Sequence, residues 1–150
     1  ELCAQADVAF ATGHSSPTES LLMAQAAHDM GFKKCIITHP NALIWKMSPA
    51  QLERAASLGA WIEFCYLGRF WGEDSAMPTY PRQSLQEATE ILRVAPERTF
   101  ITTDLGQVGM PRPVAGMRQA RNELLKAGFS AASLKSMLSD TPAYLIGLEK

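Results

Sequence analysis

Short apolar runs alternate with longer stretches of helical periodicity along this chain. The apolar runs predict strands over residues 7–12, 34–38, 60–66 and 99–103. The stretches that follow them predict helices over residues 16–30, 48–59, 84–94 and 114–127. A strand followed by a helix, repeated four times, is typical of a parallel sheet with right-handed helical connections.

Helix boundaries are marked by serine and glycine. The motifs Ser-Pro-Thr-Glu at 16–19 and Ser-Pro-Ala-Gln at 48–51 each place a capping serine before a proline, with Glu or Gln three residues after the serine. A glycine at the far end, such as Gly31, permits the left-handed turn that stops a helix. Towards the carboxyl end, Ser130 is expected to cap one short helix and Asp140 another.

Three polar residues close predicted strands in equivalent positions. His14, His39 and Asp104 each follow an apolar run and open a loop. The carboxyl ends of parallel strands lie on one rim, where catalytic groups collect. Two imidazoles and a carboxylate on such a rim are suitable metal ligands or acid–base groups. Glu63 recurs at the same interval and is expected to face the site, either towards substrate or in an ion pair.

A long insertion follows the third predicted strand. Residues 67–82 are rich in aromatic residues, glycine and proline, and a long loop on this rim is expected to form a lid or pocket wall. Trp71 is a candidate for that wall, with packing of the lid as the alternative. Arg69 in this loop and Arg112 in the loop after the fourth strand either clamp a carboxylate or phosphate or are exposed loop charges.

Composition narrows the class of protein. A chain of 150 residues, 47% of them hydrophobic, is expected to form a single α/β domain over residues 1–150. The net charge of -1 gives no basic surface for nucleic acid, and no apolar run is long enough to span a membrane. The three scattered cysteines indicate buried thiols in a reducing compartment, so a cytoplasmic protein is expected.

The order of the motifs resembles a known family. Thr-Gly-His-Ser-Ser-Pro-Thr-Glu at 12–19, Thr-His-Pro at 38–40 and Thr-Thr-Asp-Leu-Gly at 102–106 are similar to the later strand ends of metal-dependent hydrolases of the amidohydrolase superfamily. Residues 128–148 are similar to the segment that commonly closes such barrels. The resemblance covers nearly the whole chain. It implies an α/β fold of the (β/α)8 TIM-barrel type, of which four βα units, strands five to eight, are present.

The resemblance also implies a divalent metal, with zinc as the expected ion. His14 and His39 match the family's metal-binding histidines, and Asp104 matches the carboxylate that contacts metal and takes a proton from the attacking water. The His-x-His motif of the family's first strand does not occur in the chain. The chain therefore resembles the carboxyl-terminal half of such an enzyme. A missing amino-terminal half, or a second copy in a homo-oligomer, is expected as its partner.

Three hypotheses for function follow. The first is a metal-dependent hydrolase in which metal-activated water attacks an amide, ester or lactone bond of a small polar substrate. The second is a decarboxylase of the same superfamily, which uses a similar site. The third is a non-catalytic half-barrel with a binding or structural role, because an open sheet with two unpaired edges invites association.

Overall fold

A four-stranded parallel sheet organises the chain, of which the computed structural model describes residues 1–148. The strands are β1 (Phe10–Ala11), β2 (Cys35–Ile37), β3 (Trp61–Cys65) and β4 (Thr99–Thr102), and they pair in the order β1-β2-β3-β4. Each strand therefore lies beside its neighbour in sequence, with register pairs such as Ile36 with Trp61 and Phe64 with Ile101. This arrangement places the carboxyl ends of all four strands on one rim.

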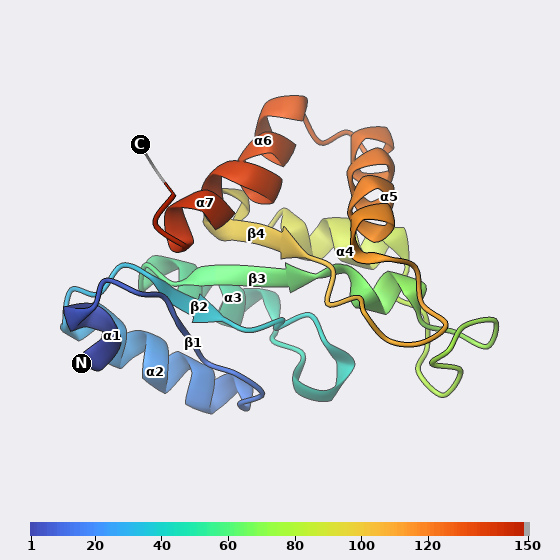
Figure 1. Cartoon of the computed structure of the whole chain (residues 1–150). Coiled ribbons are helices and arrows are strands. Elements are labelled where there is room, and N and C mark those ends of the chain that lie inside the picture. The colour runs from blue at the N-terminus through green and yellow to red at the C-terminus, as the bar shows by residue number, and fades with distance from the viewer. Residues whose placement is uncertain (149–150) are drawn as a thin grey trace.

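Helices connect and flank the strands. The α-helices are α1 (Leu2–Gln5), α2 (Pro17–Asp29), α3 (Pro49–Ser57), α4 (Leu85–Leu92), α5 (Pro113–Lys126), α6 (Ala131–Lys135) and α7 (Thr141–Leu145). Short 3-10 segments are η1 (Leu43–Trp45), η2 (Tyr66–Phe70) and η3 (Pro96–Arg98), and η4 (Ser136–Asp140) is π-helical. Figure 1 shows α1 and α2 beside the β1 edge of the sheet and the group α5, α6 and α7 beside the β4 edge.

The predicted helix starts are confirmed where serine caps them. Ser16 and Ser48 each accept a hydrogen bond from the backbone three residues on, and the Glu or Gln there bonds back to the serine N–H. Ser130 caps α6 through the backbone N–H of Ser133. The prediction for Asp140 is wrong: its backbone is already helical, because η4 runs on into α7, and its carboxylate pairs with Lys135.

The barrel prediction is also wrong. The (β/α)8 TIM-barrel type fold with strands five to eight is replaced, over the described residues, by a small α/β domain whose open sheet ends at β1 and β4. β1 contributes only two residues to the sheet, and the C-terminal segments η4 and α7 contact β4. Alternating strands and helices predict parallel pairing between neighbours. Closure depends on strand tilt and stagger, which the alternation does not specify.

Two clusters of buried side chains form the core. The amino-terminal core joins one face of β2 and the start of β3 to α2 and α3, and includes Ala24, Cys35, Ile37, Leu52, Ala55 and Ile62. The carboxyl-terminal core joins β3 and β4 to α4, α5 and η4, and includes Phe64, Tyr66, Leu92, Ile101, Leu124 and Met137. A fully buried large apolar side chain contributes about 1.5–3 kcal/mol, so both clusters stabilise the sheet that carries the rim.

None of the helices in residues 1–148 combines the length and the apolar character that crossing a membrane requires.

Candidate functional site

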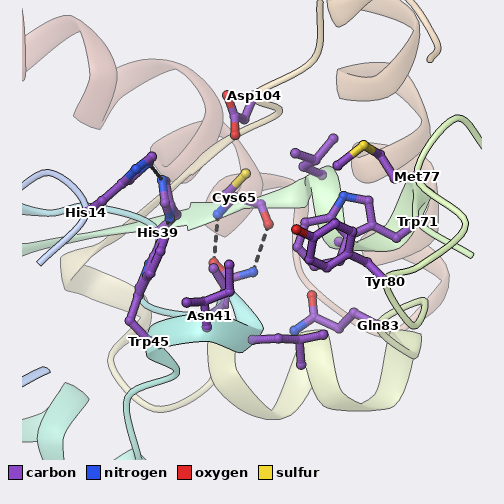
Figure 2. A pocket seen from close by; sticks show the side chains of 15 residues that line it. His14, His39, Asn41, Trp45, Cys65, Trp71, Met77, Tyr80, Gln83 and Asp104 are labelled. Carbon is purple, nitrogen blue, oxygen red and sulfur yellow. Dashed lines mark hydrogen bonds between the residues drawn. The ribbon is translucent and has the colours of Figure 1, made fainter. Parts of the chain in front are cut away.

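A cavity of about 160 Å³ opens on the rim at the carboxyl ends of the strands. It brings together His14, His39 and Asp104, which come from three separate loops. Figure 2 shows the histidines on one side of the cavity, the aromatic side chains of the long insertion on the opposite side, and Asp104 at its edge. The side chains labelled there are His14, His39, Asn41, Trp45, Cys65, Trp71, Met77, Tyr80, Gln83 and Asp104.

The two histidines face each other through their ring nitrogens. The Nε2 atoms of His14 and His39 are 3.0 Å apart. Trp45 donates from its indole Nε1 to Nδ1 of His39 at 3.2 Å, and its ring stacks on His14 with centroids 4.7 Å apart. A neutral His39 that accepts at Nδ1 carries its proton on Nε2. It then donates that proton to Nε2 of His14, whose own proton lies on Nδ1.

Two of these residues have a strained backbone conformation. His39 has φ of 25° and Asp104 has φ of 50°, both in the left-handed region that side chains other than glycine rarely adopt. Each such residue costs on the order of 1–3 kcal/mol, and strain of this kind is concentrated at functional sites. His39 is buried, whereas the side chain of Asp104 is exposed. The strained turns therefore aim an imidazole and a carboxylate at one cavity.

The base of the cavity is held by Asn41 and Cys65. Asn41 is buried and donates from Nδ2 to the Cys65 carbonyl at 2.8 Å, while its Oδ1 accepts from the Cys65 N–H at 3.0 Å. These two bonds fasten the loop after β2 to the end of β3. Burial raises the pKa of the Cys65 thiol to about 12, and the negative charges of Asp104 and Glu63 add to the increase. The thiol is therefore protonated near neutral pH and is a poor nucleophile.

The opposite wall comes from the long insertion and the residues after it. The rings of Trp71 and Tyr80 lie with centroids 4.9 Å apart, and Met77 and Gln83 complete this side. The insertion thus lines the cavity, and Trp71 both lines it and packs against the carboxyl-terminal core, so the structure does not separate the two alternatives for this residue. Within residues 1–148, Trp71 Nε1 and Gln83 Oε1 are buried and have no hydrogen-bond partner.

The other candidate residues lie outside this cavity. Glu63 is half-buried on β3 and accepts from the Thr102 hydroxyl at 3.0 Å. Arg69 belongs to the insertion but does not line the cavity: it pairs with Glu123 at 3.0 Å and donates to the Gln83 carbonyl. Arg112 is exposed and precedes α5 as its N-cap residue. The structure does not bring these three side chains together with the histidines, and their proposed roles in substrate binding stay predictions.

Two imidazoles are the candidate metal ligands of this cavity. Among residues 1–148, no three His, Cys, Asp or Glu side chains lie close enough together to hold a metal ion. Two nitrogen ligands at about 2.0–2.1 Å from a tetrahedral zinc are roughly 3.4 Å apart. The 3.0 Å between the histidine Nε2 atoms is close to that edge, so the pair fits two positions of a metal site.

Sequence reasoning missed several residues of the site. Trp45 contacts both histidines, and Gln83 lines the cavity. Trp45 is the last residue of η1 and Gln83 lies just before α4, both well past the strand ends, so the strand-end pattern does not mark them. Cys65 was assigned to the core as a buried thiol, and it is buried, but its place at the end of β3 also makes it part of the cavity lining.

Comparison with known proteins adds one partial match. Residues 1–63 match the model of a family of unknown function, DUF6282. The matched part contains His14, His39 and Trp45, and it ends before Trp71, Gln83 and Asp104. No curated protein and no solved structure matches the chain.

Proposed function

We propose that this protein is a metal-dependent hydrolase that acts on a small polar substrate bound in the rim cavity. The observation that carries the proposal is the pair of imidazole nitrogens 3.0 Å apart at the ends of neighbouring strands, with Asp104 lining the same cavity. The resemblance of the strand-end motifs to the amidohydrolase superfamily supports it. The strain at His39 and Asp104 supports it as well, because the fold maintains two costly turns at this rim.

His14 and His39 would hold a divalent metal, for which zinc is the expected ion, through their Nε2 atoms. Such an ion lowers the pKa of bound water to about 7 and polarises a carbonyl oxygen, which are the two contributions that hydrolysis of an amide or ester needs. Asp104 is the carboxylate of the cavity and is exposed, so it is free to accept a proton from water. The aromatic wall of Trp71 and Tyr80 gives the substrate an apolar surface opposite the histidines.

Trp45 has to move for both imidazoles to bind metal. A neutral histidine that ligates through Nε2 carries its proton on Nδ1. At present Nδ1 of His39 accepts a hydrogen bond from Trp45 Nε1. Metal binding therefore replaces that bond, and the Nδ1–H of His39 needs an acceptor in its place. Trp45 is the last residue of η1, between the exposed Ile44 and Lys46, and its ring is half-buried.

Metal content tests the proposal directly. The protein is incubated with zinc, dialysed against metal-free buffer and measured by elemental analysis, alongside His14→Ala and His39→Ala. We expect retained zinc in the parent protein and loss from both variants. His28→Ala is the matched control, because His28 lies on α2, bonds the Leu58 carbonyl and does not line the cavity. Equal zinc in the parent and both cavity variants, or none in the parent, would contradict the assignment.

A further inference from the structure

Most polar side chains on the histidine side and at the base of the cavity are bonded to the protein itself. The imidazoles of His14 and His39 face each other, and the indole N–H of Trp45 donates to His39. Both polar atoms of the Asn41 amide are bonded to the main chain of Cys65. In the metal-free protein these groups therefore leave few polar atoms with which a ligand could pair.

The wall opposite the histidines presents apolar surface (Figure 2). Trp71 Nε1 and Gln83 Oε1 are buried within this wall, so neither atom is open to a ligand. The rings of Trp71 and Tyr80 lie with centroids 4.9 Å apart, and Met77 lines the same side. Aromatic rings and a thioether both make favourable contacts with a further aromatic ring. This wall therefore suits an aromatic group of the ligand.

The mouth, the charge and the size of the cavity narrow the ligand further. Leu43 and Ile44 line the cavity although both are exposed, so its mouth is apolar as well. No lysine or arginine occurs among the described residues that line it, whereas Asp104 contributes a carboxylate, so an anionic ligand is disfavoured. A cavity of about 150 Å³ holds one benzene molecule, so the 160 Å³ here suits one ring with a small substituent.

We propose that the ligand of this cavity carries an uncharged aromatic ring of the size of a phenyl group, which packs against Trp71 and Tyr80. The inference deepens the hydrolase function by describing the rest of the substrate: the bond to be cleaved is its polar part and faces the histidines, and the ring is its apolar part. It rests on the hydrolase function only in making this ligand the substrate, because binding of the ring requires no metal.

Four small probes test this preference on protein freed of metal by a chelator. Benzamide has the ring and a neutral polar group, acetamide lacks the ring, cyclohexanecarboxamide has a saturated ring, and benzoate is an anion. Ligand-observed NMR measures their dissociation constants. Benzamide should bind roughly 10- to 100-fold more tightly than acetamide, because the ring buries apolar surface. It should bind roughly 2- to 10-fold more tightly than cyclohexanecarboxamide, because only an aromatic ring makes the specific contacts with the wall. Benzoate should bind more weakly than benzamide.

Any of the other three probes binding as tightly as benzamide overturns the inference, and so does absence of benzamide binding.

Variants of Tyr80 test the contact with the wall. Tyr80→Leu removes the aromatic ring and should lower the affinity for benzamide roughly 2- to 10-fold, whereas Tyr80→Phe keeps the ring and should bind as the parent does. Tyr144→Leu is the matched control, because Tyr144 packs on Trp61 and does not line the cavity. Unchanged affinity in Tyr80→Leu, or an equal loss in Tyr80→Phe, contradicts packing of the ring on Tyr80.

The tryptophans of the chain report where the ring binds, without any change to the cavity. Trp45 and Trp71 line it, whereas Trp61 lies outside it and donates to the Lys33 carbonyl. The indole N–H signals of isotope-labelled protein are assigned with single Trp→Phe variants, and benzamide is then added to the parent. Its ring current should shift the signals of Trp45 and Trp71 and leave that of Trp61 unchanged. A shift of Trp61 alone overturns the inference.

The hydrolase proposal fails separately from this inference. Benzamide preference in a protein that retains no zinc after dialysis supports the aromatic ligand and contradicts the metal site. Zinc retention by a protein that binds benzamide no better than acetamide supports the metal site and overturns the aromatic ligand.

Discussion

Trp45 contacts both imidazoles of the rim cavity at once: it donates from Nε1 to Nδ1 of His39 at 3.2 Å and stacks on His14. This contact determines the protonation pattern of the pair, because a His39 that accepts at Nδ1 carries its proton on Nε2. The proton then occupies Nε2 of His39, one of the two nitrogens that a metal ion would need as ligands. The tryptophan therefore favours the metal-free arrangement.

Trp45→Phe should consequently bind zinc more tightly than the parent protein. A neutral hydrogen bond contributes about 0.5–1.5 kcal/mol, so its removal should raise the affinity by roughly 2- to 10-fold. Competition with a chromophoric chelator measures the change. Trp61→Phe is the control, since Trp61 donates to the Lys33 carbonyl and does not line the cavity. Unchanged or weaker zinc binding in Trp45→Phe would show that the indole does not oppose the metal.

Asp104 offers a test in which stability and catalysis change in opposite directions. Asp104→Gly should melt at a higher temperature than the parent, because glycine adopts a φ of 50° without strain. The same variant should lose turnover, and so should Asp104→Asn, by about 10²–10⁴-fold, because neither can accept the proton of water. Calorimetry and an amide hydrolysis assay on both variants check this. Full turnover in Asp104→Asn would remove Asp104 from the mechanism.

The cysteines should differ sharply in reactivity. Burial raises the pKa of Cys65 to about 12 and that of Cys35 to about 11. At pH 8 only about one Cys65 side chain in ten thousand is then a thiolate, and the thiolate is the reactive form. Iodoacetamide should therefore modify the half-buried Cys3 first, as peptide mass spectrometry can show. Rapid labelling of Cys65 in the folded protein would mean that the cavity lowers its pKa, contrary to this account.

Low pH should lower the free energy of unfolding through the contacts of Glu123. Burial by itself would raise the pKa of Glu123, but hydrogen bonds from Tyr66, Gln119 and Arg69 outweigh it and lower the pKa below its ordinary 4.5. A carboxyl whose folded pKa is lowered stabilises the fold fully above its unfolded pKa, and this contribution disappears as pH falls through the folded value. The free energy of unfolding should therefore decrease less in Glu123→Gln than in the parent protein when the pH is lowered from 7 to 3. Denaturant unfolding at pH 7 and at pH 3 measures the difference.

At pH 7 the same variant should be less stable than the parent. Glu123 Oε2 accepts from the Tyr66 hydroxyl at 2.6 Å and from Arg69 at 3.0 Å, and Tyr66 is fully buried. Weakening these contacts should cost about 1–3 kcal/mol, less the share that solvent screens at the partly exposed ion pair. Gln119→Ala, which removes only an exposed bond to Glu123, is the milder comparison. Equal pH profiles for the parent and Glu123→Gln would contradict the role of the carboxylate.

Local signals in the sequence predicted the elements well. Serine caps place the starts of α2, α3 and α6, because a side-chain oxygen three residues from a free N–H is a short-range feature. Asp140 shows the limit of that reasoning, since its capping role depends on whether the preceding helix stops, and η4 does not stop there. The prediction of a barrel is wrong for a similar reason. Curvature and closure of a sheet are set by tilt and stagger across all strands, which no single motif reports.

The site was predictable where it follows strand ends and not elsewhere. His14, His39 and Asp104 line one cavity, and the sequence predicts this meeting because parallel strands bring their carboxyl ends to one rim. Trp45 and Gln83 reach the cavity from loops whose paths depend on tertiary packing, and Arg69 is drawn away from it by Glu123. A charged residue in a rim loop thus gave a poorer indication of the site than a polar residue at a strand end.

The walls of the cavity come from segments that are anchored in different cores, and this has a mechanical consequence. His14 and His39 lie in loops that follow β1 and β2, two strands that pack in the amino-terminal core. Trp71 packs against the carboxyl-terminal core, and Leu105, which follows Asp104, is part of that core. A ligand bound between these walls contacts segments that belong to both cores. Its binding free energy stabilises the protein against local unfolding that separates the two cores. Amide hydrogen exchange should therefore slow in both α2 and α5 when the ligand binds, although neither helix lies beside it.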